Sequence, residues 1–247
     1  MSVGPRFWVA DLANTRTKLA PVSGGRLGQV RAQETAKLSR ASLSRFLPRD
    51  KTLPLVLADV VPTKGKLLEA AWKGEVFRVR GRNAPGVDFD YPKPNEIGAD
   101  RIANAAAARA LYGCPVIVMD FGTVLDVEVI DAQGKFCGGA LAPGWNLFSN
   151  AMGERTALVP HLDGQPPARP IARSTRDAVR SGCHHGYRGL ARELLARIKA
   201  QLGARRVKVI ITGGQGGLFA EALPGVTAVN PLLTLEGLRI MGTFLYG

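Results

Sequence analysis

Three short apolar runs in this chain each end in a turn that suits close approach to a ligand. The run over residues 6–11 ends in Asp11, the run over 115–120 ends in Asp120, and the run over 207–212 leads into Gly213 and Gly214. Apolar runs of this length between turn signals are typical of buried strands. Acidic, hydroxyl and glycine residues at strand ends let the backbone approach phosphate oxygens or a metal-bound nucleotide. The arrangement favours an α/β protein. Taken alone, the turn after Asp11 is better explained as an ordinary polar hairpin turn, and the turn at Gly213 is also compatible with an ordinary strand-to-helix turn.

The whole chain is expected to mix strands with helices. Expected strands cover residues 6–11, 16–22, 29–34, 53–59, 115–120, 125–130, 135–141, 207–212 and 226–229, and expected helices cover 64–72, 99–111, 189–202, a short stretch after 214 and the chain from 235. The helix over 99–111 is predicted from its alanine content, and Gln133–Gly134 predicts a hairpin turn. His184 and His185, between two glycines, are expected in a loop without a metal. The chain is expected to divide into residues 1–113 and 114–247.

Composition excludes several classes of protein. The 247 residues are 46% hydrophobic and 21% charged, which is ordinary for a globular protein and disfavours disorder. The three cysteines are far apart and lack metal-ligand spacing, which favours a reducing compartment over a disulfide scaffold. No apolar run approaches membrane-spanning length. We therefore expect a soluble, cytoplasmic protein with no membrane partner.

The formal charge of +13 allows two interpretations. It can reflect a basic surface, or it can attract anionic ligands such as nucleotides or nucleic acid. Residues 171–208 hold ten Lys or Arg and two acids. The helix expected there has one apolar face, which leaves the basic side chains in solvent; that face comprises Leu190, Leu194, Leu195, Ile198 and Leu202. We therefore predict no specific nucleic-acid binding.

The segment from Tyr91 to Asn104 reads YPKPNEIGADRIAN and places Asp100 and Arg101 at the start of the expected helix. A positioned carboxylate can accept the proton of an alcohol during attack on phosphate. A neighbouring guanidinium can bind a substrate carboxylate or carbonyl. Without its flanking residues, the same pair would be interpreted as a capped helix with a surface ion pair.

Taken in order, the three strand-end turns resemble the phosphate-one, phosphate-two and adenosine motifs of the actin, hexokinase and sugar-kinase superfamily. No Walker motif occurs. Residues 91–104 resemble the substrate motif of type III pantothenate kinases. Further matches to that family lie at residues 120–123, 138–144, 156–158, 174–175 with Gly182 and Gly186, and 233–238.

This resemblance implies two actin-like, ribonuclease H-like domains with mixed sheets flanked by helices and a nucleotide cleft between them. It implies ATP-dependent phosphorylation of pantothenate, the first step of coenzyme A biosynthesis, by a homodimer that uses Mg²⁺ and a monovalent cation, K⁺ or NH₄⁺. Asp100 matches the catalytic base, Asp120 the cation ligand and Thr123 an ATP contact. The substrate-binding matches are Tyr91, Gly98, Ala99, Arg101 and Thr175. The first phosphate loop matches Asp11, Leu12, Ala13, Asn14, Thr15, Arg16, Thr17 and Lys18.

Three departures from the family pattern keep alternatives open. Ala13 stands where glycine is usual, Val124–Leu125–Asp126 replace a commoner Ala-Thr-Thr, and Glu128 stands where aspartate is common. An added methyl crowds a phosphate loop, and Asp126 adds negative charge near the phosphate path. The alternatives are an inactive or regulatory relative of the family and a kinase of another small alcohol.

Overall fold

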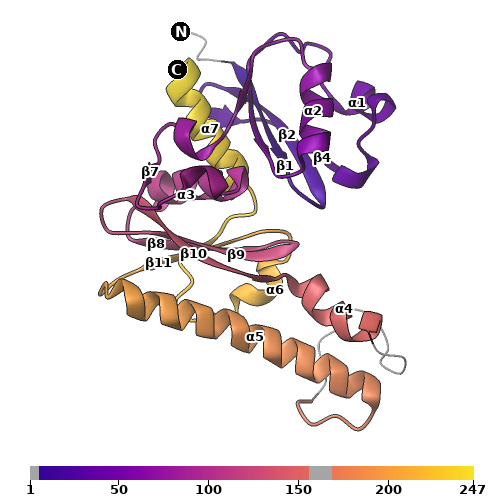
Figure 1. Cartoon of the computed structure of the whole chain (residues 1–247), viewed down its shortest axis with the longest axis vertical. Helices are drawn as coiled ribbons and strands as arrows, with labels where there is room; N and C mark the ends of the chain where they lie inside the picture. The colour runs from indigo at the N-terminus through magenta and orange to yellow at the C-terminus, as the bar shows by residue number, and fades with distance from the viewer. Residues whose placement is uncertain (1–5, 156–168) are drawn as a thin grey trace. The chain divides into compact units, whose positions relative to one another are not determined.

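The computed structural model describes residues 6–155 and 169–247. The chain divides into two compact units, one of Met1–Val116, Glu128–Gly138 and Leu232–Gly247, the other of Ile117–Val127 and Gly139–Pro231. Both are α/β, with helices against mixed sheets, as the sequence predicted (Figure 1). Residues 156–158, which match the family motif, and His161, which is expected in a polar loop, lie outside the described part of the chain.

The first unit is built on a sheet of order β3-β2-β1-β5-β6, with β4 paired to β2. Its strands are β1 (Phe7–Leu12), β2 (Arg16–Ser23), β3 (Arg26–Leu27), β4 (Arg31–Glu34), β5 (Leu55–Asp59) and β6 (Val76–Arg78). β1 pairs antiparallel with β2 and parallel with β5, in a register that sets Leu12 opposite Asp59. The ends of β1 and β5 therefore meet at one edge of this sheet.

Helices cover both faces of this first sheet. They are α1 (Arg40–Phe46), α2 (Pro62–Ala71), α3 (Ala99–Tyr112) and α7 (Leu233–Tyr246), with short 3-10 turns η1 (Thr35–Lys37), η2 (Gly81–Asn83) and η3 (Pro94–Glu96). Ala10 and Leu12 of β1 join the core under α1 and α2, whereas Phe7 packs on Tyr246 of α7. The alanines of α3 are buried against α7, where a Cβ atom on Gly237 would collide with the backbone of Ala103.

The second sheet has the order β12-β11-β8-β9-β10-β7. Its strands are β7 (Asp88–Phe89), β8 (Val116–Phe121), β9 (Val124–Ile130), β10 (Lys135–Pro143), β11 (Lys208–Thr212) and β12 (Ala228–Val229). The predicted Gln133–Gly134 turn lies between β9 and β10, and Asp131 closes it by accepting from the Gln133 and Lys135 amides. The strands of this sheet were predicted from sequence to within a few residues, except β7, which was not predicted.

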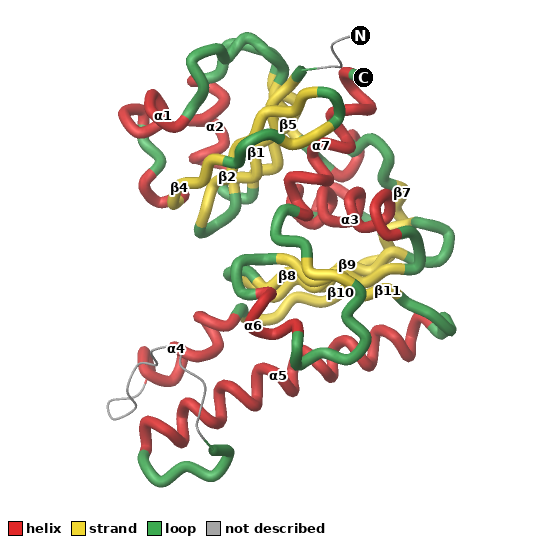
Figure 2. The backbone as a smooth tube through the Cα atoms, turned by 180° about the vertical axis from the view of Figure 1, so that it is seen from behind, coloured by secondary structure: helices red, strands yellow, loops and turns green. Residues whose placement is uncertain are grey.

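The second unit packs its helices on β8, β9 and β11 (Figure 2). The helices are α4 (Trp145–Arg155), α5 (Thr175–Leu202) and α6 (Gly216–Ala220). Tyr187 of α5 is fully buried among four aromatic rings. Its ring centroid lies 4.7 Å from that of Phe219 and 5.5 Å from those of Trp145 and Phe148. No helix in the described residues combines the length and hydropathy needed to cross a membrane.

The prediction for His184 and His185 was wrong, because both lie inside α5. Glycines at 182, 186 and 189 lower helix propensity by about 1 kcal/mol each. Burial outweighs that cost, since side chains spaced four residues apart all face the core of the second unit. These are Val179, Cys183, Tyr187, Ala191 and Leu195. The predicted apolar face of residues 190–202 is confirmed as the continuation of this stripe.

Candidate active site

The turn that follows β1 is fastened by Thr35. Asp11 is buried at the end of β1, while the side chains of residues 14–16 are exposed. The Thr35 hydroxyl donates to the carbonyl of Ala13 at 2.7 Å and lies 3.0 Å from the hydroxyl of the buried Thr17. The Thr35 amide donates to the carbonyl of Thr15 at 2.9 Å. The expected phosphate turn is thus a braced loop with an exposed tip.

Val60 joins this turn to the expected substrate segment. Its amide donates to the carbonyl of Leu12 at 3.1 Å. A Cβ atom on Gly98 would lie 3.8 Å from Cγ1 of Val60. Within the first unit, the structure therefore brings the predicted phosphate turn and the start of α3 to the same edge of the sheet.

Asp100 sits in the first turn of α3, half-buried, with Gly98 as the residue before the helix. Its carboxylate Oδ1 accepts from the backbone amide of Arg101 at 2.9 Å. Burial raises the pKa of the Asp100 carboxyl above its ordinary value, and the Arg101 amide and guanidinium offset part of that rise. A carboxylate with a raised pKa is a stronger base than an exposed one, which suits proton acceptance from an alcohol.

Arg101 points into a cluster of buried groups from the second sheet. Its Nε lies 3.5 Å from Oε1 of Glu128, and its guanidinium carbon lies 5.7 Å from the ring centroid of Phe136. Tyr91 packs edge-on against the same ring, with centroids 5.9 Å apart. Two predicted substrate residues, Tyr91 and Arg101, therefore contact one phenyl ring within the first unit.

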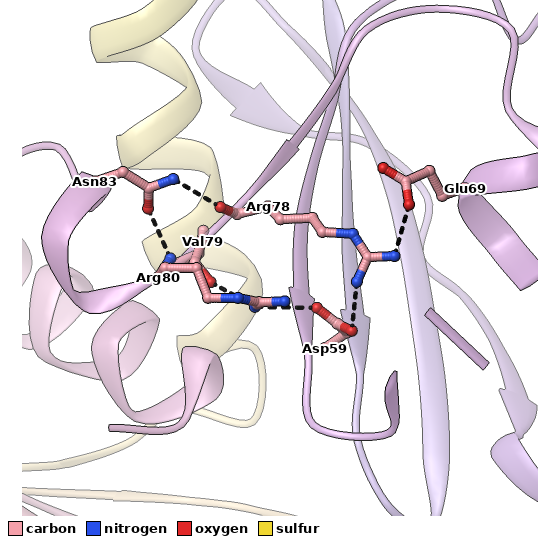
Figure 3. A network of polar contacts seen from close by, with 6 residues as sticks. All are labelled: Asp59, Glu69, Arg78, Val79, Arg80 and Asn83. Carbon is pink, nitrogen blue, oxygen red and sulfur yellow. Dashed lines mark hydrogen bonds and ion pairs between the residues drawn. The ribbon is translucent and has the colours of Figure 1, made fainter. Parts of the chain in front are cut away.

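A second polar cluster stands at the end of β5 (Figure 3). The Asp59 side chain has no exposed surface and pairs with Arg78 at 2.8 Å and with Arg80 at 3.2 Å. Arg78 also pairs with Glu69 of α2 at 2.7 Å, and Asn83 donates to its carbonyl. This network links β5, α2, β6 and η2, and the backbone of η2 at Gly81 packs directly on Pro94 of η3. The loop that leads from η3 to Asp100 therefore packs against η2.

The other predicted nucleotide residues belong to the second unit and converge there. Asp120 lies near the end of β8, and the turn through Gly122 and Thr123 leads into β9. The Phe121 carbonyl accepts from the Gln215 amide at 3.1 Å. Gly213 has a φ of +86°, and a Cβ atom there would collide with Oδ1 of Asp120. The predicted phosphate-two and adenosine turns are thus neighbours.

Thr175 is the exposed first residue of α5, after the helix cap at Ser174, whose hydroxyl accepts from the Asp177 amide. It lies in the second unit, apart in sequence from the four substrate candidates of the first unit. In residues 6–155 and 169–247, no group of three or more His, Cys, Asp or Glu side chains could hold a metal ion.

Comparison with known proteins identifies the family of this chain. The model of the family described as type III pantothenate kinase matches residues 7–197. The chain belongs to the type III pantothenate kinase family. A type III pantothenate kinase of Methylacidiphilum infernorum is 36% identical over 238 residues, covering 96% of this chain and 88% of the relative. One of Akkermansia muciniphila is 38% identical over 235 residues, covering 95% and 97%.

Solved structures show the same fold at low identity. An inorganic polyphosphate/ATP-glucomannokinase from an Arthrobacter strain has a TM-score of 0.53 at 16% identity, covering 99% of this chain and 100% of that chain. Ta0583, an archaeal actin homologue, has a TM-score of 0.53 at 12% identity, covering 95% and 98%. The predicted actin-like, sugar-kinase-like fold of this type III pantothenate kinase family member is confirmed.

Sequence reasoning did not find the supporting residues of the site. Asp59 carries the same signal as Asp11 and Asp120, an acid that ends an apolar strand, and could have been singled out on that ground. Glu128 was noted only as a departure from the family pattern. Phe136 gives no local signal, because an aromatic residue in a strand is usually core. These residues enter the site through pairing between distant segments.

Proposed function

We propose that this chain transfers the terminal phosphoryl group of ATP to the primary hydroxyl of pantothenate, as the family does. The observation that carries this proposal is Asp100, a half-buried carboxylate with a raised pKa in the first turn of α3, within the family's substrate motif. Asp100 would accept the hydroxyl proton as the oxygen attacks phosphorus. Such a positioned base contributes about 10²- to 10⁴-fold to the rate.

The remaining predicted residues would align the reactants. Tyr91, Gly98, Ala99, Arg101 and Thr175 would bind pantothenate, and residues 11–18 with Thr123 would bind ATP. The exposed tip of the braced turn after β1 supports the phosphate role, because backbone and side-chain donors there can reach phosphate oxygens. Phosphoryl transfer depends mainly on such alignment and on neutralising charge.

Two cations complete the proposal. Mg²⁺ would accompany ATP and neutralise its phosphates when bound. A monovalent cation, K⁺ or NH₄⁺, would be held by Asp120. A hard cation prefers oxygen ligands, and the half-buried Asp120 carboxylate at the end of a strand suits one. Gly213 packs so closely on this carboxylate that a Cβ atom there would collide with Oδ1 of Asp120.

We also propose that the enzyme acts as a cytoplasmic homodimer, on the strength of its family. Sedimentation velocity of the purified protein would test the dimer. A single species of 26.3 kDa across micromolar concentrations would contradict it.

The direct test is to incubate purified protein with ATP, Mg²⁺, K⁺ and pantothenate and to detect 4′-phosphopantothenate by mass. The matched control is Asp100→Asn, which keeps the size of the side chain. Product from the wild type and little from the variant would support the proposal. Turnover only with other primary alcohols would favour a kinase of another substrate, which the departures at Ala13, Asp126 and Glu128 leave open. ATP binding without turnover of any alcohol would favour a regulatory relative.

A further inference from the structure

The Arg101 side chain is held from two sides. Only 14% of it is exposed. Glu128 of β9 faces its Nε at 3.5 Å, and the Phe136 ring of β10 lies 5.7 Å from its guanidinium carbon. A long side chain on the first turn of a helix normally samples many rotamers. Here an ion pair and a cation–π contact limit that freedom.

Glu128 is fully buried, which constrains its role. A buried carboxylate is costly unless a positive or hydrogen-bonding partner compensates it. Arg101 supplies positive charge from α3, an element that lies 27 residues earlier in sequence. Because Glu128 sits within a strand that is paired on both sides, its carboxylate is a rigid anchor for the guanidinium.

Phe136 links Arg101 to Tyr91. Its ring is fully buried and contacts Phe89 at 6.0 Å as well as Tyr91 at 5.9 Å. Movement of this ring would therefore displace both predicted substrate residues at once. One packed cluster within the first unit thus contains Tyr91, Arg101, Glu128 and Phe136.

Asp100 and Arg101 are consecutive in α3, so their side chains leave the helix about 100° apart. Two such residues can serve separate ends of one elongated ligand. Pantothenate carries its reactive hydroxyl at one end and a carboxylate at the other. A guanidinium can engage one carboxylate through Nε and a second through its terminal nitrogens, in the planar geometry that carboxylates match.

We propose that Glu128 is a positioning residue that orients Arg101 to receive the carboxylate of the substrate, with Phe136 supporting the guanidinium from its other side. The role rests on the proposed function, in which Asp100 serves the hydroxyl end. It makes residue 128 a determinant of selectivity for carboxylate-bearing over neutral substrates. The glutamate reaches Arg101 with one methylene more than the aspartate common in the family.

The test compares pantothenate with pantothenamide, in which a neutral amide replaces the carboxylate. The variants are Glu128→Ala, which removes the anchor, and Glu128→Gln, which keeps its length and an acceptor oxygen. In Glu128→Ala, we expect the kcat/KM preference for pantothenate to fall about tenfold or more, mainly through the KM for pantothenate. In Glu128→Gln, which keeps the length of the side chain but removes its charge, the preference should fall by less than in Glu128→Ala. The KM for ATP should change in neither variant.

Glu193→Gln, which alters an exposed pair on α5, is the matched control and should leave both substrates unaffected. If Glu128→Ala does not fold, as judged by its melting curve, Phe136→Leu replaces it and should lower the same preference. An equal fall for both substrates, or an unchanged preference in an active folded variant, would overturn the role of Glu128. Wild-type protein that does not phosphorylate pantothenate would instead overturn the proposed function, and the positioning role with it.

Discussion

The carboxylate of Asp100 folds back over Gly98, so that a Cβ atom on Gly98 would lie 2.6 Å from Oδ1 of Asp100. That separation is too short for unbonded carbon and oxygen, so a side chain at 98 must displace the carboxylate. Gly98 therefore determines where the proposed base points.

Gly98→Ala should lower kcat about tenfold to a hundredfold while the protein still folds, because a shift of about 1 Å in a reacting group has effects of this size. Steady-state kinetics and a thermal melt would measure both. Gly189→Ala is the control: no atom lies near its position in α5, and alanine should stabilise the helix by about 1 kcal/mol. Normal turnover in Gly98→Ala would contradict the placement of Asp100.

Asp100→Asn should reduce turnover by about 10²- to 10⁴-fold, the usual contribution of a general base. In the wild type, activity should fall as pH is lowered through the pKa of Asp100. Because burial raises that pKa, the acid limb should lie above the pH at which an exposed aspartate titrates. A rate profile that is flat down to the range of exposed aspartates would exclude Asp100 as the base.

Asp100→Asn should lower turnover but raise the stability of the folded protein at neutral pH. A carboxyl whose pKa is raised by folding contributes stability that is complete below its unfolded pKa and is lost as pH rises through its folded pKa. At neutral pH the ionised, half-buried Asp100 therefore costs stability. Asp100→Asn should melt at a higher temperature than wild type at pH 7, and the difference should vanish in acid. A variant that is less stable than wild type at pH 7 would refute this.

Asp59→Asn should destabilise the first unit by about 2 to 3 kcal/mol, because it removes the buried charge that faces Arg78 and Arg80. Denaturant unfolding followed by circular dichroism would measure the change. Glu34→Gln, which breaks the exposed pair with Lys37, should cost less than about 0.5 kcal/mol. Equal effects of the two substitutions would show that the Asp59 network adds little stability.

Gly213→Ala should raise the KM for ATP about tenfold or more, since the added methyl meets Asp120 and the residue would be held at a φ of +86°. The matched control is Gly217→Ala, because a Cβ atom at position 217 would have no neighbouring atom within 4 Å. Titration with ATP at saturating pantothenate would separate the two. A variant at 213 with unaltered KM for ATP would remove this turn from the nucleotide site.

Activity should require a monovalent cation if Asp120 holds one. Replacing K⁺ with Na⁺ or a bulky organic cation should slow turnover at constant ionic strength, and Asp120→Asn should remove the difference between salts. Initial rates in the three chloride salts would decide. Equal rates of the wild type in all three would disprove a cation site at Asp120.

The sequence by itself determined the family and many of the local elements. Apolar runs that end in Asp11, Asp120 and Gly213 were visible because a strand and its turn are contiguous, and the alanine-rich helix after Gly98 was visible for the same reason. The motif over residues 91–104 singled out Asp100, the proposed base, and its neighbour Arg101. Such signals depend only on residues a few positions apart.

Only the tertiary structure decided what surrounds those residues. Arg101 meets Glu128, and Asp59 meets Arg78 and Arg80, because sheet order and register bring distant strands together. The glycine-containing start of α5 is helical for a similar reason: burial of its four-residue stripe outweighs weak local propensity. Side-chain pairing across long separations depends on how the strands align, and no local pattern encodes that alignment.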